Sequence, residues 1–464
     1  MDKKKANTKK LFNPESVAVI GATNNSEKLG FHVMKSLTNG GYAGKIIPVN
    51  PGSDGVAGIK SFPSVNYYDG HIDLAIIVVP AKLVPEVFRE CAYKGVKGIV
   101  MITAGFREIE DPMGADLHDE IADIANDAEI PVIGPNTFGM VNLHADLNAS
   151  FTPEFSQIKR GGIALVSQSG GISHQLGFMG IRMDAGFSKI VGLGNRLNTD
   201  FAPMVDYLMD DPDTKVIMLY LEGIDEPRDL VETVKKHCGR KPVIAYKSGS
   251  AMVGDRASQS HTGSMAGRSE IYMGAFGQAG ILCVDSLEAL IDTAKVLSAC
   301  PIPDGPGVAV LSGQAGPAMV ACDVCEAEGL VIVGFDSNTQ QRINECLPPL
   351  ALRTNPVDMG PAWYDASATG GIIRAVMDDA SVNGILLLLM FASANVDVIK
   401  GIMRPLVDWR QKKPLISCIS APPGIWDKEI CQLEKSGAIV NCATPERAAT
   451  AMANLWRLGK LNKT

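Results

Sequence analysis

The chain has 464 residues, of which 46% are hydrophobic and 20% charged, which is typical of a globular protein of about three domains. It holds 51 acidic and 43 basic residues, a net charge of −8, and this argues against a broad basic surface for nucleic acid. Glycine is in excess, with 47 residues, whereas aromatic residues make up only 6%, which favours many tight strand-to-helix turns over a β-sandwich.

The first residues, MDKKKANTKK, are basic and are followed by LFNPES rather than by an apolar segment. We interpret them as a frayed, solvated tail and not as a signal peptide. The longest apolar stretch, Ile385 to Ala392, is far shorter than the ~20 residues of a transmembrane helix, so we expect no membrane association. The ten cysteines are scattered, and we expect reduced thiols and a cytoplasmic location. Cys322 and Cys325 have redox-motif spacing, but without a second pair or a histidine cluster we interpret them as helix packing.

Residues 1–150 alternate short apolar runs with amphipathic segments and are predicted to form the first domain. The predicted strands are Ser16–Gly21, Lys45–Val49, Leu74–Val79, Gly98–Ile102 and Pro131–Gly134. Helices are expected between them, for example over Pro85–Gly95 and Leu117–Ala128. Apolar strands separated by helices indicate a parallel sheet covered on both faces, with ligands at the carboxyl ends of its strands.

The first strand leads into a glycine-bearing turn, Gly21 to Gly30, which offers backbone N–H groups and a helix N-terminus to a phosphate. The turn is not GxGxxG, and the second strand ends in Asn50-Pro51, where an NAD site would need an acidic residue for the ribose. An acid there would repel a ribose that carries a phosphate, so its absence fits coenzyme A. Lys28 adds a mobile cation nearby. The alternative is a strand-to-helix turn with no ligand.

Two further blocks, residues 151–303 and 304–464, open with the same pattern of a strand, a small polar turn and a helix. Each block continues with a long apolar strand, a Lys-Pro-containing strand and a final strand that runs into a helix capped by Ser286 or Thr444. The common order of four features favours an internal duplication of a flavodoxin-like domain, with chance similarity between αβ units as the alternative.

The turns that open these two blocks are candidate phosphate sites. They consist of Ser167, Gln168, Ser169, Gly170 and Gly171 in one block and of Ser312, Gly313, Gln314, Ala315 and Gly316 in the other. Two helix N-termini directed at one site could hold a charged phosphoryl group between them. The alternative is that small residues simply suit tight turns.

One histidine and one glutamate are a candidate pair of catalytic residues. His261 differs from the other six histidines because it lies in a polar loop without hydrophobic periodicity, where a nucleophilic imidazole could travel between a donor and an acceptor. Glu222 closes the apolar strand Val216–Leu221, and its carboxylate could fix the tautomer of that imidazole. The alternatives are a surface-loop histidine and an acid at a helix start.

Together these residues resemble the nucleoside-diphosphate-forming acyl-CoA synthetases, specifically the α subunits of the ADP-forming acetyl-CoA synthetases, which are relatives of succinyl-CoA synthetase. The resemblance runs from Leu11 to about Leu458, and its most specific part is Ser260–Ser264, which matches the phosphohistidine loop of the family. The segments Phe12–Ala22 and Asn355–Asp358 are also similar. Thr23 stands where many relatives have serine, and the turn that follows lacks a proline often found there.

The resemblance implies a Rossmann-like CoA-binding domain followed by two flavodoxin-like domains, and the reaction acyl-CoA + ADP + phosphate ⇌ acid + CoA + ATP. Phosphate would attack the thioester, and the phosphoryl group of the acyl phosphate would pass to His261 and then to ADP. Glu222 would orient His261, and the two small turns would face the phosphohistidine. CoA would contact residues of four strand-end turns and Asn136: Gly21, Ala22, Thr23, Lys28, Gly30, Val49, Asn50, Pro51, Val79, Pro80, Ala81, Thr103, Ala104, Gly105 and Asn136.

The ATP-grasp domain of the family has no counterpart in this sequence, and no GxxxxGK[ST] motif occurs. We therefore expect a separate ATP-grasp β subunit that carries Mg²⁺ and the nucleotide, in an α2β2 assembly, and neither a metal site nor a tightly bound prosthetic group on this chain. A small carboxylic acid, its CoA ester and phosphate would be the other partners. Fusion to an acetyltransferase domain is disfavoured because the chain has no room for it. A non-catalytic CoA-sensing protein is the remaining alternative.

Overall fold

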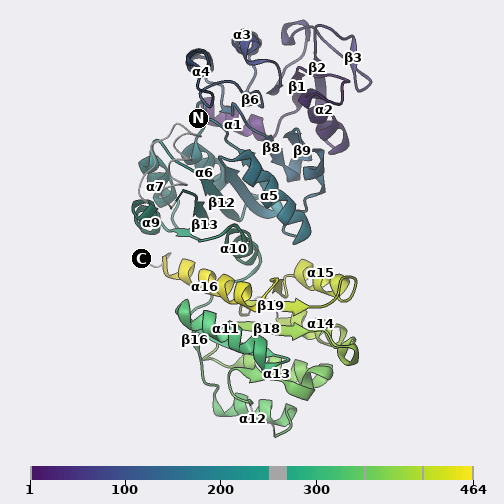
Figure 1. The fold of residues 1–464 in the computed structure, drawn as a ribbon, viewed down its shortest axis with the longest axis vertical. Coiled ribbons are helices and arrows are strands. Elements are labelled where there is room, and N and C mark those ends of the chain that lie inside the picture. Colours follow the sequence, from purple (N-terminus) through teal and green to yellow (C-terminus); the bar gives the residue numbers. More distant parts are fainter. Residues whose placement is uncertain (1–2, 250–268, 350–351, 410–411, 462–464) are drawn as a thin grey trace. The chain divides into compact units, whose positions relative to one another are not determined.

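The computed structural model describes residues 3–249, 269–349, 352–409 and 412–461. They form two compact units, Met1–Cys283 and Val284–Thr464. Helices alternate with strands along both units (Figure 1). In the part of the chain so described, no helix combines the length and the apolar character needed to cross a membrane.

Unit 1 begins with a parallel five-stranded sheet in the order β2-β1-β5-β6-β7. The strands are β1 (Ser16–Ile20), β2 (Lys45–Val49), β5 (Leu74–Ile77), β6 (Gly98–Met101) and β7 (Val132–Ile133). The connecting elements are α2 (Leu29–Asn39), β3 (Gly55–Val56), β4 (Ile59–Lys60), η1 (Val65–Tyr67), η2 (Ala81–Leu83), α3 (Val84–Lys94) and α4 (Pro112–Asp127). The five predicted strands are thus confirmed, although four of them end one or two residues earlier than predicted.

Helices cover both faces of this sheet, which explains its apolar strands. On one face Val19 of β1 shares a buried cluster with Val33 of α2. On the other face Ala18 of β1 shares a cluster with Phe88 of α3 and Ile121 of α4. With both faces covered, the strand ends and their loops are the places where this domain can meet a ligand.

The second sheet of unit 1 has seven strands in the order β14-β13-β12-β10-β11-β8-β9. The strands are β8 (Gly139–Asn142), β9 (Leu147–Ser150), β10 (Arg160–Ser167), β11 (Phe187–Gly192), β12 (Val216–Leu221), β13 (Val243–Lys247) and β14 (Ile281–Cys283). The other elements are η3 (Leu143–Ala145), η4 (Pro153–Gln157), α5 (Gly170–Arg182), α6 (Phe201–Asp210), α7 (Pro227–Lys236) and α9 (Ser269–Gln278). The hairpin β8-β9 pairs with β11 in antiparallel orientation, so residues 139–150, which we predicted in the first domain, extend the second sheet.

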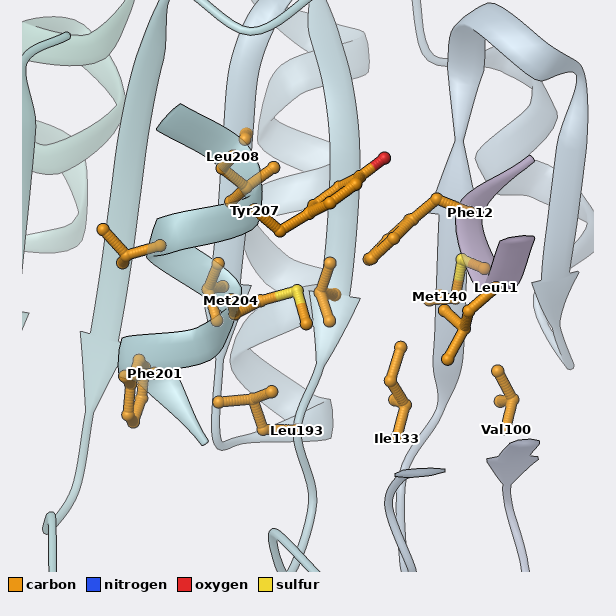
Figure 2. Packing of buried hydrophobic residues seen from close by; sticks show 14 of the residues in the cluster. Leu11, Phe12, Val100, Ile133, Met140, Leu193, Phe201, Met204, Tyr207 and Leu208 are labelled. Atoms are coloured by element: carbon orange, nitrogen blue, oxygen red, sulfur yellow. The ribbon is translucent and has the colours of Figure 1, made fainter. Parts of the chain in front are cut away.

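The basic N-terminal segment is helical, and the prediction of a frayed tail is wrong. Lys3–Phe12 forms α1, whose last two residues, Leu11 and Phe12, are fully buried. The ring of Phe12 stacks on Tyr207 of α6 with the ring centroids 4.5 Å apart, and Leu11 lies near Met140 (Figure 2). Lys5 also forms an ion pair with Asp206 at 2.9 Å. Lysines dominate the composition of this segment, but its last two residues are apolar and buried, and Phe12 contacts the distant helix α6.

Unit 2 contains a parallel sheet in the order β16-β15-β18-β19-β20, with β17 beside β15. Its strands are β15 (Gly307–Ser312), β16 (Val331–Ile332), β17 (Val357–Asp358), β18 (Gly384–Met390), β19 (Leu415–Ser420) and β20 (Val440–Asn441). Its helices are α10 (Leu287–Ala299), α11 (Ala315–Ala327), α12 (Ser337–Cys346), η5 (Gly360–Tyr364), α13 (Ala366–Asp378), η6 (Ser393–Asn395), α14 (Val398–Trp409), α15 (Asp427–Ser436) and α16 (Pro445–Leu461). The order is that of β11-β10-β12-β13-β14 in unit 1, which is the topology that a duplication requires.

Helix α10 belongs to unit 2, where it packs against α16. Asp292 of α10 accepts two hydrogen bonds from Arg447 of α16, at 2.6 and 3.0 Å. Ser286 caps α10 and Thr444 caps α16, as predicted from their positions. Our predicted domain boundaries, at residues 150 and 303, remain predictions; they assign α10 to the second domain.

Candidate active site

One cavity of about 1070 Å³ lies in unit 1, at the carboxyl ends of strands from both of its sheets. It is bordered by the turns after β1, β2, β5, β6 and β7 of the first sheet and after β10, β11 and β12 of the second. The predicted site residues that line it are Gly21, Thr23, Lys28, Val49, Asn50, Pro51, Val79, Pro80, Thr103, Ala104, Asn136, Gln168, Ser169, Gly170, Gly171 and Glu222. The structure therefore brings most of the predicted CoA residues of unit 1 together with the first phosphate turn and Glu222.

The other predicted residues of unit 1 lie in the same turns without lining the cavity: Ala22, Gly30, Ala81, Gly105 and Ser167. Gly30 does not line the cavity, but it determines the shape of the first turn. A Cβ atom at Gly30 would lie 2.1 Å from the carbonyl oxygen of Gly21, so any other residue would displace the first turn. Gly21 itself has φ +98°, and a Cβ atom there would meet the carbonyl oxygen of Val78 at 2.7 Å. Close backbone packing thus requires both glycines.

The end of β2 holds the first turn in place. The side chain of Asn50 donates to the carbonyl oxygen of Ala22 at 2.7 Å, and the N–H of Gly21 donates to the carbonyl oxygen of Val49 at 2.9 Å. Asn50 therefore has a structural role beside its place in the cavity wall. Lys28, directly before α2, is exposed and leaves a cation at the cavity edge.

The turn after β10 leads into the 13-residue helix α5. Ser169 caps this helix by accepting a hydrogen bond from the N–H of Ile172 at 3.4 Å. Gly170 and Gly171 have open space beside them, since a Cβ atom at either position would meet protein atoms no closer than 3.9 Å. The N-terminus of α5 therefore meets the cavity with little side-chain cover.

Gln168 connects this turn to Glu222. It is 6% exposed, and its Oε1 accepts hydrogen bonds from the N–H groups of Glu222 and Gly223, at 2.6 and 3.1 Å. Its Nε2 has no hydrogen-bond partner among the described residues. A buried amide donor without a partner is rare in folded proteins, so this cavity wall has a donor available for a ligand.

His261, the predicted nucleophile, lies outside the described residues. Ser312–Gly316, the second predicted phosphate turn, lies in unit 2 between β15 and α11. There the hydroxyl of Ser312 donates to the carbonyl oxygen of Gln314 at 2.6 Å, just as Ser167 donates to Ser169 at 3.0 Å in the first turn. The two turns thus repeat one local hydrogen-bonding pattern.

Several cavity residues were missed by our sequence analysis: Phe138, Phe151, His174, Asn195 and Arg196. His174 of α5 lies among four phenylalanines. Its Nδ1 lies 2.7 Å from the carbonyl oxygen of Gly170, which can only accept, so Nδ1 carries a proton. Its Nε2 lies 2.6 Å from the hydroxyl of Thr152. Both ring nitrogens are thus satisfied, which is the default interpretation for a helical histidine.

Comparisons with known proteins agree with this geometry. A family model described as a CoA binding domain matches residues 15–142, and one described as a succinyl-CoA ligase-like flavodoxin domain matches residues 160–297. The α subunit of acetate–CoA ligase [ADP-forming] II from Pyrococcus furiosus is 37% identical, over 97% of this chain and 97% of its own. This chain belongs to the ADP-forming acetate–CoA ligase family. The predicted family and fold class are therefore confirmed.

Two other members of the family extend the comparison. A Candidatus Korarchaeum cryptofilum structure, described as a dinucleotide-forming acetyl-coenzyme A synthetase with phosphate and ADP, matches with a TM-score of 0.89 and 32% identity, over 98% of this chain and 97% of that one. Acetate–CoA ligase [ADP-forming] I of Archaeoglobus fulgidus is 35% identical, over 98% of this chain but only 64% of its own. The Archaeoglobus protein is therefore longer than the part that this chain matches.

Proposed function

We propose that this chain is the α subunit of an ADP-forming acyl-CoA ligase, which converts acyl-CoA, ADP and phosphate into a carboxylic acid, CoA and ATP. The observation that carries the proposal is the composition of the cavity in unit 1. The glycine turn of a CoA-binding domain, the N-terminus of α5 and Glu222 all border the same space. Thioester, phosphate and a phosphoryl acceptor must meet in such a space if the phosphate is to pass between them.

CoA would lie along the carboxyl ends of the first sheet. Gly21 presents backbone close to the cavity, and Lys28 supplies the cation nearest the N-terminus of α2 for a CoA phosphate. The cavity is as large as the upper end of the usual range for ligand sites, roughly 300–1,000 Å³, which suits an extended nucleotide thioester. Asn136 would contact the thioester end.

Inorganic phosphate would lie at the N-terminus of α5, where the helix dipole favours an anion. The Nε2 of Gln168 would donate to it, which would satisfy the buried donor noted above. In the first step a phosphate oxygen attacks the carbonyl carbon of the thioester. The C–S bond breaks, the thiolate of CoA leaves and takes up a proton, and an acyl phosphate forms.

The second step would transfer the phosphoryl group to His261. A neutral imidazole nitrogen attacks phosphorus, the P–O bond to the acyl group breaks, and the carboxylate leaves. Glu222 would accept a hydrogen bond from the other ring nitrogen and stabilise the charge that develops on the ring. In the third step a β-phosphate oxygen of ADP attacks the phosphorus of the phosphohistidine, the P–N bond breaks, and ATP forms as the imidazole is released.

The third step would take place on a partner. We propose an ATP-grasp β subunit that carries ADP and Mg²⁺, in an α2β2 assembly in the cytoplasm. The greater length of the Archaeoglobus relative supports a second part of the machinery beyond the matched region. In the described part of this chain, no group of three or more His, Cys, Asp or Glu side chains is arranged to hold a metal ion.

The test is phosphoryl labelling of the complete enzyme, meaning this chain with its ATP-grasp partner, Mg²⁺ and γ-labelled ATP. We expect an acid-labile, base-stable label on this chain. The label should be absent in His261→Asn and retained in the control His71→Asn, since His71 is exposed and does not line the cavity. Equal labelling of His261→Asn would overturn the assignment. CoA binding without any labelling of the wild type would instead favour the CoA-sensing alternative.

A further inference from the structure

Three polar side chains form a series of hydrogen bonds in and behind the cavity wall, at the residue proposed to contact the thioester, Asn136. The Nδ2 of Asn136 donates to the Oδ1 of Asn195 at 3.3 Å, and the Nδ2 of Asn195 donates to the Oε2 of Glu108. Asn136 and Asn195 line the cavity, whereas Glu108 does not. The side chain of Glu108 is thus linked to Asn136 through Asn195.

Backbone hydrogen bonds hold all three residues in place. The carboxylate of Glu108 accepts hydrogen bonds from the N–H groups of Gly105 and Phe106, in the turn after β6. The N–H of Asn136 donates to the carbonyl oxygen of Thr103 at 2.9 Å, and the N–H of Asn195 donates to that of Pro135 at 2.9 Å. The chain of hydrogen bonds therefore joins the loops after β6, β7 and β11, and so links the two sheets of unit 1.

The donor and acceptor groups of the three side chains allow this series of hydrogen bonds to run in only one direction. An ionised carboxylate only accepts hydrogen bonds, whereas an amide side chain has one accepting and one donating end. Facing Glu108, Asn195 must use its donating end, which leaves its oxygen towards Asn136. Asn136 must then direct its own Nδ2 towards Asn195. The charge of Glu108 thereby determines how the amide of Asn136 is turned.

We propose that Glu108 is a positioning residue that sets the amide orientation of Asn136 through Asn195, and with it the group that Asn136 presents to the acyl end of bound CoA. This inference rests on the proposed function for the substrate, but the hydrogen-bond chain itself does not depend on it. The reacting end of the thioester then meets an amide in one orientation rather than in a mixture of two.

A charge-conserving exchange tests the proposal. In Glu108→Gln the side chain is no longer acceptor-only. Its amide can face the Nδ2 of Asn195 with its nitrogen or with its oxygen, so the orientation of the two asparagines is no longer determined. In Asn195→Asp two carboxylates face each other. In the double variant, Glu108→Gln with Asn195→Asp, the introduced amide nitrogen donates to one oxygen of the introduced carboxylate, while the other oxygen still accepts from Asn136. Glu108→Asp is the conservative control, because it keeps an acceptor-only group in front of Asn195.

The measurements use the complete enzyme. In each single variant we expect the kcat of thioester phosphorolysis to fall about 10- to 100-fold, the range for misplaced reacting groups. The dissociation constant of CoA should change less than about threefold, since the parts of CoA remote from the reacting centre supply most of its binding. The kcat of the double variant should be at least about tenfold higher than that of the less active single variant. The kcat of Glu108→Asp should exceed that of Glu108→Gln. A double variant no better than the weaker single variant would overturn the proposal, as would equal losses in Glu108→Asp and Glu108→Gln.

A second readout separates this inference from the proposed function. With ¹⁵N-labelled asparagine, the side-chain NH₂ signals of Asn136 are assigned by comparison with Asn136→Ala. We expect Glu108→Gln to shift them and the double variant to restore them, whether or not the enzyme turns over. Failure of wild-type turnover would count against the proposed function, and unshifted Asn136 signals in Glu108→Gln would count against the orientation.

Discussion

The side-chain oxygen of Gln168 accepts hydrogen bonds from the backbone N–H groups of Glu222 and Gly223, at 2.6 and 3.1 Å. Gln168 follows β10 and Glu222 follows β12, and these two strands are neighbours in the sheet. One buried amide therefore connects the turn that opens α5 to the backbone of Glu222, the residue whose carboxylate would orient the nucleophile. Two substitutions separate its two functions.

Gln168→Leu removes both ends of the amide and leaves the N–H groups of Glu222 and Gly223 without their acceptor. We expect the rate of phosphohistidine formation to fall about 10- to 100-fold, because Glu222 would no longer be held in place. Rapid-quench labelling of the complete enzyme with γ-labelled ATP measures this rate.

Gln168→Glu is the matched control, since it keeps the acceptor for Glu222 but replaces the Nε2 donor with a charged oxygen. We expect its main effect in the KM for phosphate, which should rise at least about tenfold because two anions would meet. If both variants changed the same parameter equally, Gln168 would not have two separable roles.

Gly30→Ala tests the shape of the first turn. The added Cβ atom would lie 2.1 Å from the carbonyl oxygen of Gly21, so the turn must shift and its fit to CoA must worsen. We expect a loss of about 1–3 kcal/mol in the free energy of unfolding, typical of overpacking, and weaker CoA binding by calorimetry. Gly274→Ala in α9 is the control, because nothing lies within 4 Å of its Cβ position, and it should be neutral or slightly stabilising. An unchanged CoA affinity in Gly30→Ala would contradict the tight turn.

Local chemistry made the cavity turns predictable from the sequence. The glycines of the first turn and the small polar residues after β10 follow apolar strands, and the carboxyl ends of parallel strands meet at one edge. Glu222 was found by the same logic. The internal repeat was visible because its features recur in the same order in both blocks.

The remaining parts depend on contacts between distant segments. Glu108 and Asn195 are 87 residues apart, and no local pattern marks Glu108 as part of a site. The same is true of α1, where lysines mask two buried apolar residues, one of which, Phe12, packs against α6. The polar residues after β11 did carry one usable signal, since Asn195 and Arg196 follow an apolar strand as Glu222 does.

We expect the stability of the protein to depend on pH because of His118 in α4. It is buried, its Nδ1 has no hydrogen-bond partner among the described residues, and burial, assisted by Arg107, lowers its pKa from 6.5 to about 4. Because the folded-state pKa lies below the unfolded one, only the unfolded state takes up a proton between pH 6.5 and pH 4, and stability falls as the pH falls through this range. The free energy of unfolding should decrease by about 2 kcal/mol between pH 7 and pH 5.

His118→Leu removes this titration and a buried polar group at once. Urea unfolding at pH 7 and pH 5 should therefore show a smaller loss of stability for the variant, by about 2 kcal/mol. His71→Leu, at an exposed position, serves as the control and should retain the wild-type loss. If wild type and His118→Leu lost the same free energy of unfolding between pH 7 and pH 5, His118 would not be the source of the pH dependence.

The pair of Asp292 and Arg447 joins α10 to α16 within unit 2. Asp292 is 2% exposed, and burial raises its pKa although the two hydrogen bonds from Arg447 act in the opposite direction. Arg447→Met would leave the buried carboxylate without its guanidinium, which typically costs about 3–5 kcal/mol. The double change Asp292→Leu and Arg447→Met removes both charges and should cost markedly less, since two apolar side chains of similar length can replace a buried ion pair. Urea unfolding of the wild type, the single variant and the double variant at pH 7 measures the difference, and a double variant less stable than Arg447→Met would contradict this account of how α10 is held.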